Sequence, residues 1–323
     1  MGSSMEKHTI LMDFNDNRLL SVLFGVHDSN LSQIERELSI TATPRGNRLA
    51  LVGSRSACRI AERALRDLYL RVEKGYGIET KDVEGAVRMA SGEDWSKNSR
   101  LHITTRKRSI SPRTVTQARY VSAMERCSLV FGIGPAGTGK TYLAVAMAVR
   151  DLLEGRVARI ILSRPAVEAG ERLGFLPGDM REKIDPYLRP LYDALHDCLP
   201  SEQLLRRMDA GEIEIAPLAF MRGRTLSNAA VILDEAQNCT SIQMKMFLTR
   251  LGEHGRMVVT GDLSQIDLPN GASPGLERAV NLLEHVDDVS IVRFGSEDVM
   301  RHRLVANILR AYEHEGGANG NED

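Results

Sequence analysis

One stretch decides the fold of this chain: Leu129-Val130-Phe131-Gly132-Ile133-Gly134-Pro135-Ala136-Gly137-Thr138-Gly139-Lys140-Thr141. It begins as a short apolar run, which is typical of a buried strand, and then breaks into glycines. Residues 134–141 fit the pattern G-x-x-x-x-G-K-[ST] of a phosphate-binding loop. Residues 142–153 are rich in Ala, Leu, Val and Met and predict a helix. Strand, loop and helix in this order favour a phosphate site over a glycine-rich turn that matches by chance.

Each residue type in the loop serves phosphate binding. The glycines permit backbone conformations that are closed to residues with a Cβ, and they let N–H groups approach phosphate oxygens. The N-terminus of the following helix adds unpaired N–H groups and the positive end of its dipole. Lys140 can reach the β- and γ-phosphates of ATP, and the Thr141 hydroxyl can ligate Mg²⁺. The expected nucleotide contacts are Gly134, Pro135, Ala136, Gly137, Thr138, Gly139, Lys140, Thr141 and Tyr142.

A second signature follows at residues 229–235, a continuous apolar run that ends in two acids. A buried parallel strand there would deliver Asp234 to the Mg²⁺ shell. Glu235, one residue further on, would face the γ-phosphate and activate water. The alternative is that the two acids only cap a helix predicted at 240–251. The phosphate loop upstream favours the catalytic interpretation.

Further apolar strands alternate with helices and complete an α/β core. A strand at 257–260 ends at the segment that carries Gln265, and the carboxyl ends of parallel strands gather at one edge of a sheet. Thr141, Glu235 and Gln265 should therefore converge. The pattern predicts a doubly wound parallel sheet of five or more strands over residues 112–314. Its other strands are expected at 158–162, 212–216 and 289–292, loops and short helices at 164–192, and helices from 273 and 296.

The first 91 residues predict a separate small α+β module that resembles a KH-type RNA-binding domain. That fold clamps RNA with a GXXG loop. The corresponding turn at 25–30 has one glycine and carries an acid, so RNA clamping and an oligomerisation or docking role both stay open. The predicted elements are a strand at 18–24, a helix from Asn30, strands at 40–43 and 48–52, and helices at 56–72 and 82–90.

Residues 92–111 predict a basic linker between the two parts. No acidic residue occurs from Lys97 to Arg119, so this segment could meet a phosphate backbone or simply be solvated. Gln117 lies upstream of the loop, near where many helicase-like ATPases carry a glutamine that reads adenine. An amide can pair with both N6 and N7 of that base.

Composition sets the remaining bounds. The 323 residues allow about two domains, and 42% apolar residues provide a sizeable core. A net charge of −1 gives no global affinity for nucleic acid, so any such surface is local. Four dispersed cysteines predict reduced thiols in a cytoplasmic protein and argue against zinc. No apolar run is long enough to span a bilayer, and the tail at 315–323 is expected to be disordered.

The motifs together resemble the PhoH-like family of bacterial ATPases, in particular its short members that carry a KH-like domain. The resemblance spans nearly all of residues 110–314. It implies a RecA-like P-loop core similar to superfamily 1 helicases, ATP hydrolysis, a cytoplasmic location, action on RNA and assembly into rings. It also implies links to phosphate starvation and to a ribosome-maturation endoribonuclease. The matching motifs are 134–141, 164–170, 173–178, 185–190, 222–225, 233–238 and 260–262.

By this resemblance the motif at residues 234–237, with Asp234, Glu235 and Gln237, holds Mg²⁺ and the attacking water. The segment 261–265, which ends in Gln265, is the motif that senses the γ-phosphate. Arg301 fits a finger or sensor position, with Arg293 as its rival. Three further arginines could touch RNA or phosphate, or equally could be structural ion-pair partners. They are Arg164, Arg222 and Arg224.

The leading hypothesis is ATP hydrolysis coupled to RNA binding or unwinding. A helicase-like motor needs two cores that close on one nucleotide, and this chain has one, so we expect a homo-oligomer, namely a hexameric ring. The alternative is a nucleotide-gated RNA-binding scaffold that docks an endoribonuclease without motor activity. A small-molecule kinase is a third possibility, but a water-activating glutamate suits hydrolysis better than transfer.

Overall fold

The computed structural model describes residues 7–92, 101–165, 180–268 and 273–300. Six of its strands form one sheet in the order β11-β6-β10-β9-β7-β8, with every neighbouring pair parallel. Every residue of β6 and β9 is buried, because helices cover both faces of a parallel sheet. The prediction of an α/β core with a doubly wound parallel sheet is confirmed. The strands are β6 (Leu129–Ile133), β7 (Arg159–Arg164), β8 (Ile213–Pro217), β9 (Ala229–Leu233), β10 (Arg256–Gly261) and β11 (Val289–Arg293).

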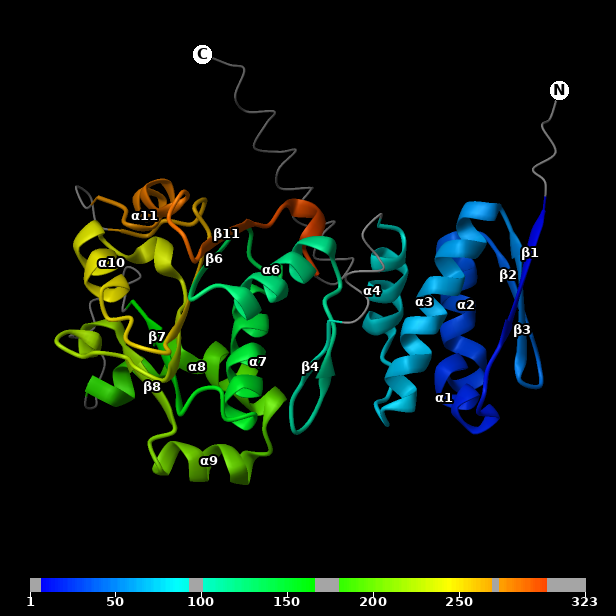
Figure 1. The fold of residues 1–323 in the computed structure, drawn as a ribbon, viewed down its shortest axis with the longest axis horizontal. Coiled ribbons are helices and arrows are strands. Elements are labelled where there is room, and N and C mark those ends of the chain that lie inside the picture. Colours follow the sequence, from blue (N-terminus) through cyan, green and yellow to red (C-terminus); the bar gives the residue numbers. More distant parts are fainter. Residues whose placement is uncertain (1–6, 93–100, 166–179, 269–272, 301–323) are drawn as a thin grey trace, which may run out of the picture.

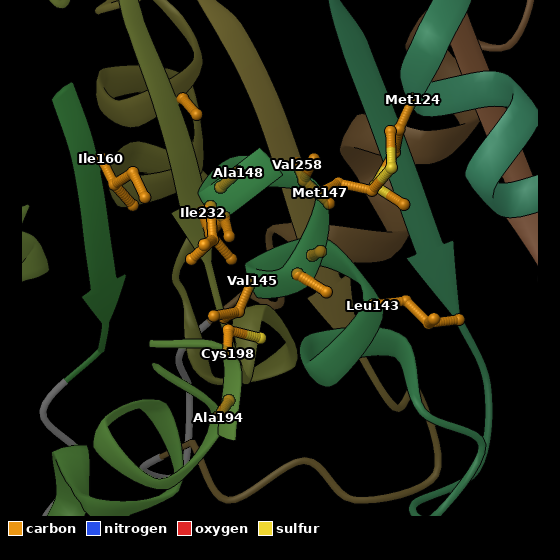
Figure 2. Close-up of a cluster of buried hydrophobic side chains, with 14 of the residues drawn as sticks. Met124, Leu143, Val145, Met147, Ala148, Ile160, Ala194, Cys198, Ile232 and Val258 are labelled. Carbon is orange, nitrogen blue, oxygen red and sulfur yellow. The ribbon is translucent and has the colours of Figure 1, made fainter. Parts of the chain in front are cut away.

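Two hydrophobic clusters fill the space between this sheet and its helices. Successive strand residues point to opposite faces, so Ile160 and Ile232 join one cluster while Ile161 and Val231 join the other. Figure 2 shows part of the first cluster, where strand side chains meet α7 and α8. The helices of the core are α6 (Val115–Arg126), α7 (Lys140–Leu153), α8 (Met180–Cys198), α9 (Ser201–Asp209), α10 (Ser241–Leu248) and α11 (Leu276–Leu283).

The N-terminal part is a small α+β unit with its own core. Its three strands form an antiparallel sheet in the order β1-β3-β2, and helices cover one side of it. Figure 1 shows α4 lying between α3 and the parallel-sheet part, with the antiparallel sheet on the far side. Its elements are β1 (His8–Asp13), α1 (Leu20–Phe24), α2 (Ser29–Leu38), β2 (Thr41–Arg45), β3 (Arg48–Gly53), α3 (Arg55–Glu73) and α4 (Thr80–Ala90).

The strand predicted at residues 18–24 is wrong. Asp16 caps a short helical turn by accepting a hydrogen bond from the backbone N–H of Arg18, and α1 follows directly. Leu20, Leu23 and Phe24 are buried at helical spacing, whereas Val22, which suggested alternation, is exposed. The first strand of the unit is instead β1, at residues 8–13.

Residues predicted as a basic linker are partly structured. β4 (Ile103–Thr104) and β5 (Ser109–Ile110) form an antiparallel hairpin, and Ile103 and Ile110 are buried in the cluster beneath α7. The solvated interpretation is therefore wrong for the buried positions 103, 105, 109 and 110, whereas position 104 and residues 106–108 at the tip of the hairpin are exposed. Residues 93–100, with the expected cations Lys97 and Arg100, lie outside the described residues.

Two expectations for the second half also change. The segment 180–198, predicted as loops and short helices, is one helix, α8, in spite of two internal prolines. The helix expected from Ser273 begins at Leu276, with Gly275 as its N-cap. The predicted helix after Ser296 and the tail at 315–323 lie mostly or wholly outside the described residues.

Candidate nucleotide site

The loop between β6 and α7 has the backbone that its glycines allow. Gly134, Gly137 and Gly139 have φ values of 145°, 83° and 83°, which side chains with a Cβ rarely adopt. A Cβ on Gly134 would lie 2.4 Å from the carbonyl oxygen of Phe294, so the loop also packs tightly against the chain after β11. The loop ends at Lys140, where α7 begins and presents its unpaired N–H groups.

Lys140 lies folded across the loop. Its Nζ donates hydrogen bonds to the carbonyl oxygens of Gly134 (2.6 Å) and Pro135 (2.7 Å) and to Oγ1 of Thr138 (3.3 Å). Burial lowers the pKa of Lys140, while the acids at the ends of β9 and β10 act in the opposite direction. The ammonium group is thus held where phosphate oxygens could replace the loop carbonyls.

Asp234 links the end of β9 to β10 and to the start of α7. It follows β9 and is almost fully buried. Its Oδ1 accepts hydrogen bonds from Oγ1 of Thr141 (2.6 Å), at the start of α7, and from Oγ1 of Thr260 (2.7 Å), in β10. A carboxylate and a threonine hydroxyl in contact are hard oxygen donors of the kind that Mg²⁺ binds through one or two direct ligands and several waters. The residues present therefore fit this cation.

Glu235 takes a strained backbone conformation at the mouth of the site. Its φ is 53°, in the left-handed region that few non-glycine residues adopt. Its carboxylate accepts a hydrogen bond from Nε2 of Gln237 (2.5 Å) and lies 3.6 Å from the Arg164 guanidinium. Arg164, a predicted phosphate or RNA contact, is thus an ion-pair partner of the predicted general base.

Gln237 and Asp262 connect β9 to β10. The side-chain oxygen of Gln237 accepts a hydrogen bond from the N–H of Asp262 (3.1 Å). Asp262 in turn accepts hydrogen bonds from Ser264 and from Nε2 of Gln265 (2.7 Å), so the predicted phosphate-sensing residue is held by its own motif. The contact of Thr260 with Asp234 was missed from sequence, whereas Gln237 belongs to the predicted motif at residues 234–237. A polar residue at the carboxyl end of an apolar strand was the available signal.

These groups surround one cavity of about 550 Å³. The phosphate loop with Lys140, Thr141 and Tyr142 lines one side of the cavity. Asp234, Glu235 and Gln265, which follow the strands, line the other side. The structure therefore brings together residues from the three predicted motifs. Burial raises the pKa of Tyr142 to about 12, so this side chain enters the site as a neutral phenol.

Gln117 lies against the loop from the opposite side. Its Nε2 donates to the carbonyl oxygen of Thr138 (2.9 Å), and its Oε1 accepts from the N–H of Arg113 (2.7 Å). An amide nitrogen carries two hydrogens and its oxygen two lone pairs, so each atom keeps capacity for one further bond. Gln117 therefore supports the phosphate loop, and its predicted contact with a base stays a prediction.

The predicted arginines differ in their surroundings. Arg224 forms a bidentate ion pair with Glu214, both distances 2.7 Å, which supports a structural role. Arg293 is exposed, with Glu284 3.6 Å away, and Arg222 is exposed. Arg301 lies outside the described residues.

The sequence also led to expectations about the cysteines, about metal binding and about membrane spans. All four cysteines are free thiols, and three of them are buried. In the described ranges, no group of His, Cys, Asp and Glu side chains has the arrangement of a metal cage, and none of the described helices has the length and hydropathy needed to cross a bilayer.

Comparison with known proteins agrees with the geometry. The profile of the family described as PhoH-like protein matches residues 109–313. A PhoH-like protein of Bacillus subtilis (strain 168) is 50% identical over 317 residues, which cover 96% of this chain and 99% of that protein. A PhoH-like protein of Mycobacterium leprae is 52% identical, covering 92% and 87%. Protein PhoH of Escherichia coli K12 is 50% identical over 205 residues, or 63% of this chain and 58% of that protein.

Proposed function

The chain belongs to the PhoH-like family of nucleotide-binding proteins, and from this premise we propose that it is a Mg²⁺-dependent ATPase that acts on RNA. The observation that carries the ATPase proposal is the contact between Thr141 and Asp234 beside Glu235. A phosphate loop alone would support nucleotide binding. An acid at the mouth of the same cavity adds a group that can act on water.

The chain's own residues supply most of what hydrolysis requires. The loop N–H groups and Lys140 would bind the β- and γ-phosphates in place of the carbonyl oxygens that Lys140 now contacts. Glu235, oriented by Gln237, would accept a proton from the attacking water. Thr141 and Asp234 would hold Mg²⁺, which when bound offsets the negative charge that develops on the phosphates.

ATPase assays on wild type and Glu235→Gln, with and without RNA, test this proposal. The amide keeps the shape of the side chain but cannot accept the proton. We expect turnover to fall by at least about 10²-fold, the lower range for general acid–base catalysis, while ATP binding persists. Glu253→Gln, on an exposed loop far from the cavity, is the matched control. Normal turnover in Glu235→Gln would remove Glu235 from the mechanism.

The RNA part of the proposal rests on the family resemblance and on local positive charge. Arg106 and Arg222 are exposed on separate loops of a chain with net charge −1. In the alternative, ATP gates an RNA-binding scaffold that docks an endoribonuclease. RNA-stimulated ATPase together with strand separation would support a motor. ATP-dependent partner binding without unwinding would support the scaffold.

We also propose that the protein works in the cytoplasm as a homo-oligomer, with a hexameric ring as the expected form. The described residues contain one parallel-sheet core, and a helicase-like site is completed by a second core. A neighbouring subunit would then supply the missing positive charge. Light scattering coupled to size exclusion should show an oligomer, and a fully active monomer would contradict the proposal.

A further inference from the structure

A second cavity, of about 490 Å³, lies on the other side of the phosphate loop. Its floor is formed by the loop and by the first turns of α6 and α7. Its opposite wall comes from the N-terminal unit, through the connection between α3 and α4, and the β4–β5 hairpin closes one side. The residues on the N-terminal wall are Arg71, Tyr76, Gly77, Ile78, Glu79 and Asp82.

The two cavities meet at the loop. Gly137, Gly139 and Tyr142 line both of them. Thr141, Asp234 and Glu235, which suit Mg²⁺ and the γ-phosphate, line only the first cavity. Gln117 lines only the second. A triphosphate bound along the loop with its γ end at Asp234 therefore points its α end, and the attached nucleoside, toward the second cavity.

The lining of the second cavity suits a nucleoside. Tyr76 and Ile78 are half-buried and offer an aromatic ring and an aliphatic side chain, while Leu143 is a buried apolar residue on the α7 side. Gln117 keeps a free amide hydrogen and a lone pair in the geometry described above. Flat apolar contact together with a few placed polar groups is the usual composition of a base-binding pocket.

Hydrogen bonds fix the N-terminal wall to the loop side. Nε of Arg71 donates to the carbonyl oxygen of Gly77 (2.9 Å), and the Arg71 guanidinium pairs with Asp82 (3.2 Å). Asp82 also pairs with Arg113 (3.3 Å), whose own N–H bonds to Gln117. A continuous chain of contacts therefore runs from the α3–α4 connection to the phosphate loop.

We propose that the nucleoside of ATP occupies this second cavity, so that the N-terminal unit forms one wall of the nucleotide site and contributes Tyr76 as a binding residue. The proposal rests on the ATP site proposed above and adds to it. It gives the N-terminal unit a part in nucleotide recognition, independent of whether that unit contacts RNA.

Displacement of radiolabelled ATP by unlabelled ATP and by inorganic tripolyphosphate separates the two compartments. Loss of aromatic stacking on a base should weaken ATP binding to Tyr76→Ala by about fivefold or more. Tripolyphosphate, which has no base, should bind this variant as it binds wild type. Tyr76→Phe keeps the ring and should bind ATP normally. Leu70→Ala, exposed on α3 and outside the cavity, is the control.

The outcomes distinguish the two proposals. If Tyr76→Ala binds ATP normally, or loses affinity for ATP and tripolyphosphate equally, the proposed role of the N-terminal unit in nucleoside binding is contradicted. The proposed phosphate site is not affected by that result. Wild type that binds neither probe would overturn both. Hydrogen–deuterium exchange of wild type needs no variant: peptides covering residues 71–82 should be protected by ATP and unaffected by tripolyphosphate. Equal protection by both probes, or none by ATP, would also overturn the nucleoside wall.

Discussion

At the scale of single residues, the most informative atom is Oδ1 of Asp234, which accepts hydrogen bonds from two threonine hydroxyls. Thr141 opens α7 and Thr260 lies in β10, so the carboxylate is fixed from two elements at once. If Thr141 turned to Mg²⁺, Thr260 would be the remaining hydrogen-bond donor to this oxygen among the described residues. Loss of a group that orients a metal ligand in this way typically costs about 10–100-fold in metal affinity or activity.

Removing the Thr260 hydroxyl should therefore weaken Mg²⁺ binding without changing the shape of the strand. We expect Thr260→Val to raise the Mg²⁺ concentration needed for half-maximal ATPase by about 10-fold, the lower range for lost metal-orienting contacts. A Mg²⁺ titration at saturating ATP measures this. Thr249→Val, at the exposed C-terminus of α10, is the control. An unchanged titration would show that Asp234 does not depend on Thr260.

Tyr120 offers a second test at this scale. Its hydroxyl is fully buried and has no hydrogen-bond partner among the described residues, and burial raises its pKa far above the ordinary value. Tyr120→Phe should stabilise the protein by about 1 kcal/mol, because an unsatisfied buried hydroxyl is removed.

Tyr69→Phe is the matched opposite, since the Tyr69 hydroxyl accepts a hydrogen bond from the N–H of Asp16 (3.0 Å). It should destabilise the N-terminal unit by about 1 kcal/mol. Urea unfolding, followed separately for the two parts of the chain, gives both differences. If both variants change the free energy of unfolding in the same direction, the hydrogen bonding of the two hydroxyls does not account for the effects.

At the scale of elements, β6 and α6 approach unusually closely at Gly132. A Cβ there would lie 2.9 Å from ring carbons of Tyr120, which is itself held in edge contact with Phe294. We expect Gly132→Ala to lower the free energy of unfolding by about 1–3 kcal/mol through overpacking. Gly77→Ala, where a Cβ meets nothing within 4 Å, should change stability far less. Equal urea midpoints for the two variants would show that the ring moves freely.

Element prediction from sequence was most accurate where burial on both faces left one choice. The central strands β6 and β9 are continuous apolar runs, and the loop glycines or acids follow them directly. The sequence therefore predicted both the presence of these strands and the positions of their carboxyl ends. Residues 18–24 failed because Leu20, Val22 and Phe24 alternate while Leu20, Leu23 and Phe24 also form a helical face. The strand-like and the helix-like spacing are both present in the sequence, and packing against the N-terminal core selects the helix. The site was predictable for the same reason as the strands, but contacts between strands, such as Thr260 with Asp234, have no local pattern.

At the scale of the whole molecule, contacts join the N-terminal unit to the phosphate loop. Arg88 of α4 donates a hydrogen bond to the carbonyl oxygen of Glu297 (3.2 Å), three residues before Met300. The N–H of Met300 donates to the carbonyl oxygen of Gly137 in the loop (2.9 Å). These hydrogen bonds therefore couple the position of α4 to that of the phosphate loop through residues 297–300.

Arg301 itself is best tested through the assembly. A finger arginine contributes about 10³–10⁵ in rate in well-studied NTPases, so Arg301→Ala alone should nearly abolish turnover while ATP still binds. If the arginine acts on a neighbouring subunit, mixing Arg301→Ala with Lys140→Ala should restore part of the activity. Each mixed ring would then contain interfaces with an intact loop on one side and an intact arginine on the other.

The mixing experiment also separates the two arginine candidates. Arg293 is exposed, with Glu284 nearby, and Arg293→Ala should keep near-normal turnover if Arg301 is the finger. Restored activity in the Arg301 and Lys140 mixture requires both subunit contact and an arginine that acts across it, because neither variant alone has a complete site. A mixture that stays inactive, although light scattering shows that the subunits exchange, would place the arginine within its own subunit. Normal turnover in Arg301→Ala would exclude Arg301 as the finger, and the activity of Arg293→Ala would then decide whether the role passes to Arg293 or is dropped.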